Sequence, residues 1–180
     1  IYGDKATADS ATFDELGTHM ALNDGVLKNG GLTSLNDLAQ CKNLKTVRIV
    51  LEYVTDVSPL SGLNSLEYID LRHNPLEDVS PLASNPALKN LSLFETHVSD
   101  LSALSACKLL EIVDVGKTWI TSFDALKGLT GVRELYMRET PLQTLAGIES
   151  MSVLEVISLS DVTDGDLSPL LTLPRLKEAV

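Results

Sequence analysis

The chain repeats one pattern of apolar residues every 22 positions, and this period constrains its fold more than any other feature. The clearest copy runs from Leu88 to Leu109. Copies open at Leu44, Leu66, Leu88, Leu110, Val132 and Leu154, and a truncated one opens at Leu176. A fixed period of about 20 to 50 residues is typical of a solenoid, in which each repeat contacts only its neighbours. The sequence therefore predicts a stack of short, similar units.

Within each copy the apolar residues recur at repeat positions 1, 4, 6, 11, 14, 17 and 20, counted from the residue that opens it. Positions 4 and 6 alternate with polar residues, which predicts one short parallel strand per repeat with one buried face. Three copies then carry Ser-Pro-Leu, at 58–60, 80–82 and 168–170, which predicts a helical start capped by Ser and followed by Pro. Too few residues remain for an α-helix, so we expect a 3₁₀ turn or an extended segment there.

This register resembles the leucine-rich-repeat family, whose repeat reads LxxLxLxx(N/T/C)xL, and its Val-Ser-Pro-Leu endings are similar to the internalin-type repeats of bacterial surface proteins. The resemblance covers residues 44–180 throughout and 22–43 loosely. It implies a fold of the α/β class: a right-handed leucine-rich-repeat solenoid. In such a solenoid a parallel β-sheet forms the concave face, and 3₁₀ or extended segments form the convex face.

Repeat position 9 departs from the family pattern in several copies. Asn74 is the Asn that the family uses there to bond the neighbouring backbone, and Thr96, Thr118 and Thr140 are expected to do this more weakly. Glu52 and Val162 do not obviously serve this purpose. Because Asp164 stands at an apolar position, we expect the last full repeat to be rearranged, with Val162 turned inward.

The period also predicts the organisation of the domain. Residues 1–21 are expected to cap the array, as a helix over 9–17 or a strand over 11–13. Residues 22–43 form a degenerate repeat, 44–175 six strict repeats and 176–180 a truncated one, so that 22–180 is one solenoid. The exposed last repeat suggests that the native protein continues, or that this end associates with another molecule, including a second copy.

Composition excludes several classes of partner and bond. A net charge of -11 disfavours nucleic acid, whose phosphates require Lys and Arg. No apolar run approaches the roughly 20 residues that span a membrane. Cys41 and Cys107 lie three repeats apart, about 14 Å in a stack of strands, which is too far for a disulfide, and they are expected to act as small apolar fillers.

Little in the sequence points to catalysis, a cofactor or a metal. Repeat position 2 alternates in sign along the array and predicts a ladder of ion pairs rather than a binding site; its members are Lys45, Glu67, Lys89, Glu111, Arg133, Glu155 and Lys177. His73, Glu95 and His97 form the one grouping like a metal site, but they lack a closed ligand set. No phosphate-binding, nucleophile or paired-carboxylate motif is present. We therefore predict no enzyme activity, no cofactor and no metal.

Large side chains at positions expected to face outward predict a binding surface. Aromatic residues and Arg are enriched at interaction hot spots, and clustered outward apolar groups mark interfaces. The candidate binding residues are Arg48, Val50, Leu51, Tyr53, Tyr68, Asp70, Arg72, Phe94, His97, Trp119, Tyr136 and Arg138. As an alternative, some of these aromatic residues pack on adjacent loops or on a neighbouring domain.

The pattern as a whole favours a non-catalytic module that recognises a protein or peptide on its concave face. The internalin resemblance implies part of a larger bacterial protein that is secreted or held at the cell surface. Two alternatives stay open: a cytoplasmic scaffold, since the repeats also resemble phosphatase-regulating proteins, and a structural spacer for another domain.

Overall fold

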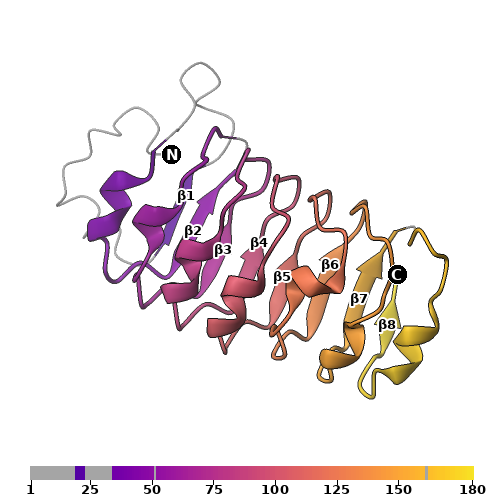
Figure 1. Cartoon of the computed structure of the whole chain (residues 1–180). Helices are drawn as coiled ribbons and strands as arrows, with labels where there is room; N and C mark the ends of the chain where they lie inside the picture. Colours follow the sequence, from indigo (N-terminus) through magenta and orange to yellow (C-terminus); the bar gives the residue numbers. More distant parts are fainter. Residues whose placement is uncertain (1–18, 23–33, 51, 161) are drawn as a thin grey trace.

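The computed structural model describes residues 19–22, 34–50, 52–160 and 162–180. Its strands form a single parallel sheet of eight, ordered as in the chain (Figure 1). They are β1 (His19–Leu22), β2 (Thr46–Ile49), β3 (Tyr68–Asp70), β4 (Asn90–Ser92), β5 (Ile112–Asp114), β6 (Glu134–Met137), β7 (Val156–Leu159) and β8 (Glu178–Ala179). The predicted capping helix or strand within residues 1–18 falls outside the described residues.

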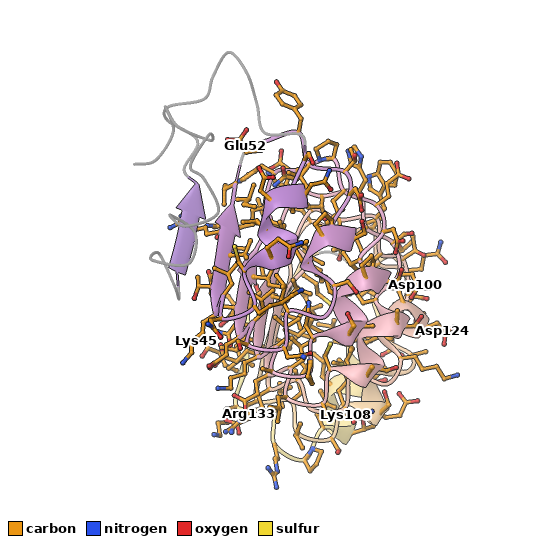
Figure 2. The ribbon with its side chains drawn as sticks, turned by 90° about the vertical axis from the view of Figure 1, so that its left-hand side faces the viewer. Lys45, Glu52, Asp100, Lys108, Asp124 and Arg133 are labelled. Atoms are coloured by element: carbon orange, nitrogen blue, oxygen red, sulfur yellow. The ribbon has the colours of Figure 1, made fainter. Side chains whose placement is uncertain are left out.

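Short 3₁₀ turns return the chain from each strand to the next. They are η1 (Asn36–Gln40), η2 (Ser58–Leu60), η3 (Ser80–Ser84), η4 (Ser102–Ala106), η5 (Phe123–Leu126), η6 (Ile148–Ser150) and η7 (Ser168–Thr172). The turns line the opposite side of the array from the sheet (Figure 1). Figure 2 shows Lys45 and Arg133 on the strand side, whereas Asp100 and Asp124 lie beside the turns. This arrangement confirms the predicted repeat fold. No helix in the described ranges has the length and apolar character of a membrane span.

The strand register follows the sequence period. Thr46 pairs with Tyr68, Tyr68 with Asn90, and each later pair keeps the offset of 22 residues. At the first step His19 pairs with Thr46, which is an offset of 27, so the strict period begins with β2. As a result, the same repeat position lies side by side on adjacent strands from β2 to β8.

The apolar repeat positions build one continuous core between the sheet and the turns. In the central copy these side chains are all buried: Leu88, Leu91, Leu93, Val98, Leu101 and Leu104. Cys41 and Cys107 are both buried, as expected for small apolar fillers, and burial raises the pKa of Cys107. Val162 packs partly buried against the core while Asp164 is exposed, which confirms the predicted rearrangement. Leu167, at an apolar position near the end of the array, is 55% exposed.

In η2, η3, η4 and η7 an Asp side chain bonds the first residue of the 3₁₀ turn, so the predicted Ser cap is wrong. No Ser side chain caps its own turn. Instead Asp56 Oδ1 accepts a hydrogen bond of 2.7 Å from Ser58 N, and Oδ2 accepts one of 2.9 Å from the Ser58 hydroxyl. The same Asp-to-Ser spacing recurs in three other copies, at Asp78, Asp100 and Asp166. These hydrogen bonds hold the pKa values of Asp56 and Asp166 below the ordinary range.

At repeat position 9, Asn74 bonds the neighbouring repeat as predicted, whereas the Thr residues of later copies bond only within their own repeat. Asn74 Nδ2 donates to the carbonyls of Ile49 at 2.8 Å and Leu71 at 2.9 Å, and its Oδ1 accepts from Val54 N at 3.1 Å. Thr96, Thr118 and Thr140 each donate to the carbonyl three residues earlier. The Thr side chains thus reproduce one of the bonds within the turn, but not the bonds of Asn74 to the preceding repeat.

The predicted charge ladder forms along repeat position 2 as two separate groups, and Glu111 between them makes no ion pair within 4.0 Å with the described residues. Lys89 Nζ donates to Glu67 Oε2 at 2.6 Å, and Arg133 Nη2 to Glu155 Oε1 at 2.6 Å. Lys45 and Lys177 complete these two groups from the neighbouring strands. Hydrogen bonds from Lys89 lower the pKa of Glu67, and those from Lys177 and Arg133 lower the pKa of Glu155.

Acid should weaken the fold through these two carboxylates. Because their pKa values are depressed in the folded state, their contribution is present above 4.5, the ordinary value for Glu, and is lost as the pH falls through the lower folded-state values. Urea unfolding over a pH series should therefore show a steeper acid loss for the wild type than for the Glu67→Gln/Glu155→Gln variant. Added salt should shrink the difference, since the pairs are screened by solvent. Identical pH profiles would contradict this role.

A buried amide at Asn85 weakens the core. It stands at repeat position 20, where other copies carry Leu63, Cys107, Leu129 and Met151, and it is fully buried. Neither Nδ2 nor Oδ1 has a hydrogen-bond partner among the described residues. Asn85→Leu should raise the free energy of unfolding by about 1 to 3 kcal/mol, because an unpaired buried polar group is removed. Chemical denaturation checks this, with exposed Asn64→Leu as a near-neutral control; a less stable Asn85→Leu protein would contradict it.

Candidate recognition surface

Two adjoining hollows lie on the outer side of the sheet between β3 and β6. The Tyr68 hollow, of about 250 Å³, is lined by residues that include Tyr68, Arg72, Ser92, Ile112, Asp114 and Tyr136. The Gly116 hollow, of about 230 Å³, is lined by Phe94, Asp114, Gly116, Tyr136 and Arg138. The two share Asp114 and Tyr136, so they form one continuous surface across four strands and the turns that follow them.

The strict register explains why these residues meet. Repeat position 5 carries Ser92, Asp114 and Tyr136 on adjacent strands, and position 7 carries Phe94, Gly116 and Arg138 just beyond them. With 22 residues between equivalent positions, each set forms a row that crosses the strands. The hollows lie along these two rows.

Gly116 makes room for its hollow because it has no side chain between Phe94 and Arg138. A Cβ atom at Gly116 would lie 2.8 Å from Cδ2 of Phe94 and 3.1 Å from the Arg138 carbonyl oxygen. The Phe94 ring therefore lies directly against the Gly116 backbone. Gly116 is not among the candidate binding residues. Comparison of position 7 across three successive copies, which carry Phe94, Gly116 and Arg138, would have identified it.

Hydrogen bonds fix the polar groups at the centre of the surface. Asp114 Oδ2 accepts from the Ser92 hydroxyl at 3.2 Å, and Oδ1 accepts from Gly116 N at 3.2 Å. The Tyr136 hydroxyl donates to Glu134 Oε2 at 2.8 Å. This hydrogen bond, followed by burial, raises the pKa of Tyr136, so the phenol stays protonated at neutral pH.

Five of the candidate binding residues line the hollows: Tyr68, Arg72, Phe94, Tyr136 and Arg138. Two others were wrongly expected to be exposed: Val50 is only 6% exposed, and Asp70 is completely buried. Leu51 falls outside the described residues.

Asp70 is buried because two guanidinium groups cover it. Arg72 donates two hydrogen bonds to Asp70, from Nε to Oδ1 at 2.8 Å and from Nη2 to Oδ2 at 2.9 Å. Arg48 Nε lies 3.3 Å from Asp70 Oδ2. Hydrogen bonding to Asp70 raises the pKa of Arg72 further. Asp70 therefore acts as an internal anchor that holds Arg72 at the wall of the Tyr68 hollow.

A second row of charges borders the surface at repeat position 8. His73, Glu95, Lys117 and Glu139 all adopt positive φ, from 54° to 58°, where the chain turns away from the strand. Their side chains then lie side by side: His73 Nδ1 is 3.3 Å from Glu95 Oε2, and Lys117 Nζ lies 3.6 Å from Glu95 and 3.9 Å from Glu139. The His73–Glu95 pair is thus part of a charge row, and the described residues hold no group of three potential metal ligands.

The remaining candidate aromatic residues lie in the turns at repeat position 10. His97 stacks on Trp119 with ring centroids 4.4 Å apart, and Trp119 is still 53% exposed. Tyr53 is 66% exposed. Phe94 is held between the His73 ring, at 5.5 Å, and the Lys117 ammonium, at 5.3 Å from its centroid. Some aromatic residues therefore do pack on adjacent turns, yet they keep an open face.

The sequence matches no protein-family model and no curated protein. Among solved structures, the chain is similar to an internalin (inlF) of Listeria monocytogenes, with a TM-score of 0.71 and 21% identity, over 82% of this chain and 44% of that one. Internalin C2 of the same species gives a TM-score of 0.67 and 21% identity, over 95% and 83%.

A plant protein is also similar: the ectodomain of the Arabidopsis thaliana receptor kinase GASSHO1/SCHENGEN3, solved in complex with CASPARIAN STRIP INTEGRITY FACTOR 2. Its TM-score is 0.58 with 18% identity, over 72% of this chain and 17% of that one. At these identities the likeness concerns the fold. Together with the register and the position 9 hydrogen bonds, it shows that the chain folds as a leucine-rich-repeat solenoid like those of the internalins.

Proposed function

We propose that this chain is a non-catalytic recognition module that binds a protein or peptide on the outer, concave side of its sheet. The observation that carries the proposal is the pair of adjoining hollows between β3 and β6. They bring together three aromatic side chains and two Arg side chains, at Tyr68, Phe94, Tyr136, Arg72 and Arg138. Tyr and Arg are among the residue types that dominate binding energy at interfaces.

The physical character of the surface supports binding more than chemistry. The aromatic side chains are held in place before a ligand arrives: Phe94 by Gly116 and Lys117, and Tyr136 by Glu134. Prior fixation reduces the entropy lost on binding. The hollows are shallow and extend across several strands, a shape suited to an extended chain or a protein loop rather than to an enclosed small molecule.

Two features of the solved neighbours support this proposal. The plant receptor kinase ectodomain was solved in complex with another molecule, CASPARIAN STRIP INTEGRITY FACTOR 2. The internalin neighbours come from a bacterium and share the fold of this chain. We extend the proposal accordingly to a bacterial protein that is secreted or displayed at the cell surface, of which this chain forms part.

Selection of peptides from a random phage-displayed library on the immobilised chain tests the proposal. Synthetic copies of the enriched peptides should bind the wild type and lose about tenfold or more in affinity with Tyr68→Ala, Phe94→Ala or Tyr136→Ala. The matched control is Glu155→Gln/Lys177→Gln, on the same sheet but outside the hollows, which should change affinity little. Circular dichroism and thermal melts confirm that each variant is folded.

Two outcomes would overturn the proposal. One is a library that yields no binder above background. The other is a set of binders whose affinities change equally with the hollow variants and with the control.

A further inference from the structure

Among the described residues, the cationic side chains on the strand side of the array are paired with carboxylates, with one exception. On the strands and the turns directly after them, each of the others lies within 4.0 Å of an acidic oxygen. The pairs include Lys45–Glu67, Arg48–Asp70, Arg72–Asp70, Lys89–Glu67, Lys117–Glu95, Arg133–Glu155 and Lys177–Glu155. Arg138 is exposed, and its guanidinium makes no ion pair or hydrogen bond with any residue that the structure describes.

The repeat pattern explains the exception. Arg72 and Arg138 both stand at position 7, and in the first case Asp70, two residues earlier at position 5, clamps the guanidinium. In the copy that contains Arg138 the residue at position 5 is Tyr136, which offers no carboxylate. The nearby Glu134 is engaged by the Tyr136 hydroxyl. Because position 5 is Tyr136 here and Asp70 in the other copy, Arg138 lacks the internal carboxylate that binds Arg72.

Arg138 also lines a hollow with aromatic walls. The Gly116 hollow is lined by Arg138 together with Phe94 and Tyr136, next to the backbone gap at Gly116. The other charged group of the hollow, Asp114, already accepts two hydrogen bonds, from Ser92 and from Gly116. Arg138 is therefore the charged group of this hollow that has no partner among the described residues, and its planar guanidinium can bind a carboxylate through two parallel hydrogen bonds.

We infer that the Gly116 hollow receives an acidic side chain of the bound protein or peptide, with Arg138 as the specificity-determining residue. The inference rests on the proposed function and specifies its ligand. An apolar or aromatic neighbour of the acidic residue would pack on Phe94 and Tyr136. Because the whole chain carries a charge of -11, long-range attraction does not favour an anion, and the preference comes from this local contact.

The test compares peptides selected in parallel from one random library on three proteins: wild type, Arg138→Gln and Lys108→Gln. Lys108 is an exposed cation away from the hollows, near the 3₁₀ turns (Figure 2), and is the matched control. Pools selected on the wild type and on Lys108→Gln should be enriched in Asp and Glu, and the pool on Arg138→Gln should not. One enriched peptide is synthesised with its acidic residue and again with Gln at that position. The wild type should bind the acidic peptide about 10- to 100-fold more tightly than the Gln peptide, and Arg138→Gln should bind the two with equal affinity.

The outcomes separate this inference from the proposed function. If the selected peptides depend on Phe94 and Tyr136 but show no acidic enrichment, or if Arg138→Gln leaves the Glu-to-Gln ratio unchanged, the inference fails while the proposed function stands. If no peptide depends on the hollow residues, the proposed function fails, and the inference with it. The affinity ratio between the acidic and the Gln peptide is measured on each folded protein separately, so a change in stability cannot imitate the result.

Discussion

Asn74→Ala is expected to lower the free energy of unfolding by about 2 to 4 kcal/mol, because several buried backbone groups lose their partner at once. The Asn74 side chain bonds the carbonyls of Ile49 and Leu71 and the N–H of Val54, all inside the stack. Truncation leaves these backbone groups buried without partners, and two of them belong to the preceding repeat. Chemical denaturation of the variant measures the loss.

The Thr residues of later repeats provide a graded control. Asn74→Thr should lose less than Asn74→Ala, because Thr at this position can still bond the carbonyl three residues earlier, as Thr96 does. Thr96→Ala should cost about 1 kcal/mol, the usual net value of one such bond. Equal losses for Asn74→Ala and Asn74→Thr would show that the bonds to the preceding repeat contribute little.

Gly116→Ala is expected to reduce the affinity for selected peptides by about tenfold or more, the size of effect seen at interface hot spots. The new Cβ would lie 2.8 Å from the Phe94 ring, so the ring must move into or across the hollow. Fluorescence anisotropy with labelled peptide measures the affinity, and thermal melts report the cost in stability.

Gly131→Ala is the matched control for Gly116→Ala. Its Cβ would also be crowded by backbone oxygens, 3.2 Å from Leu110 O and 3.3 Å from Lys108 O, but it does not line either hollow. Both variants should lose some stability, and only Gly116→Ala should lose binding. A parallel loss of binding in both would mean that affinity follows general stability, and the Gly116 hollow would not be the site.

The period predicted the fold because it specifies the register directly. A residue such as Leu91 must pair across to Val113 if every copy has 22 residues, and the structure has this pair. The first step could not be predicted in this way, since β1 is offset from β2 by 27 residues. The cap of the 3₁₀ turns was predicted to be Ser because Ser precedes Pro there. The Asp two residues before this Ser instead accepts the hydrogen bond from the Ser N–H.

The candidate surface was predicted in part, for reasons that concern side chains rather than the backbone. Outward repeat positions were identified, but the burial of Asp70 depends on two Arg side chains that fold over it. The Gly116 hollow exists because Gly116 has no side chain. The sequence was searched for large outward residues, and such a search passes over a glycine. Tyr136 and Arg138 were both predicted. The lack of an acidic partner for Arg138 among the described residues could not be predicted, because it emerges from comparison with the Asp70–Arg72 pair of the equivalent copy.

The most direct test of the recognition surface is a nuclear magnetic resonance titration of the isotopically labelled chain with one selected peptide. Recognition on the sheet predicts that the largest amide shift changes fall along β3 to β6 and the turns after them, including Gly116 and Arg138. Residues beside the 3₁₀ turns, such as Asp100 and Asp124, should be little affected (Figure 2). Shift changes concentrated at Asp100, Asp124 and their neighbours, with β3 to β6 unchanged, would contradict the account.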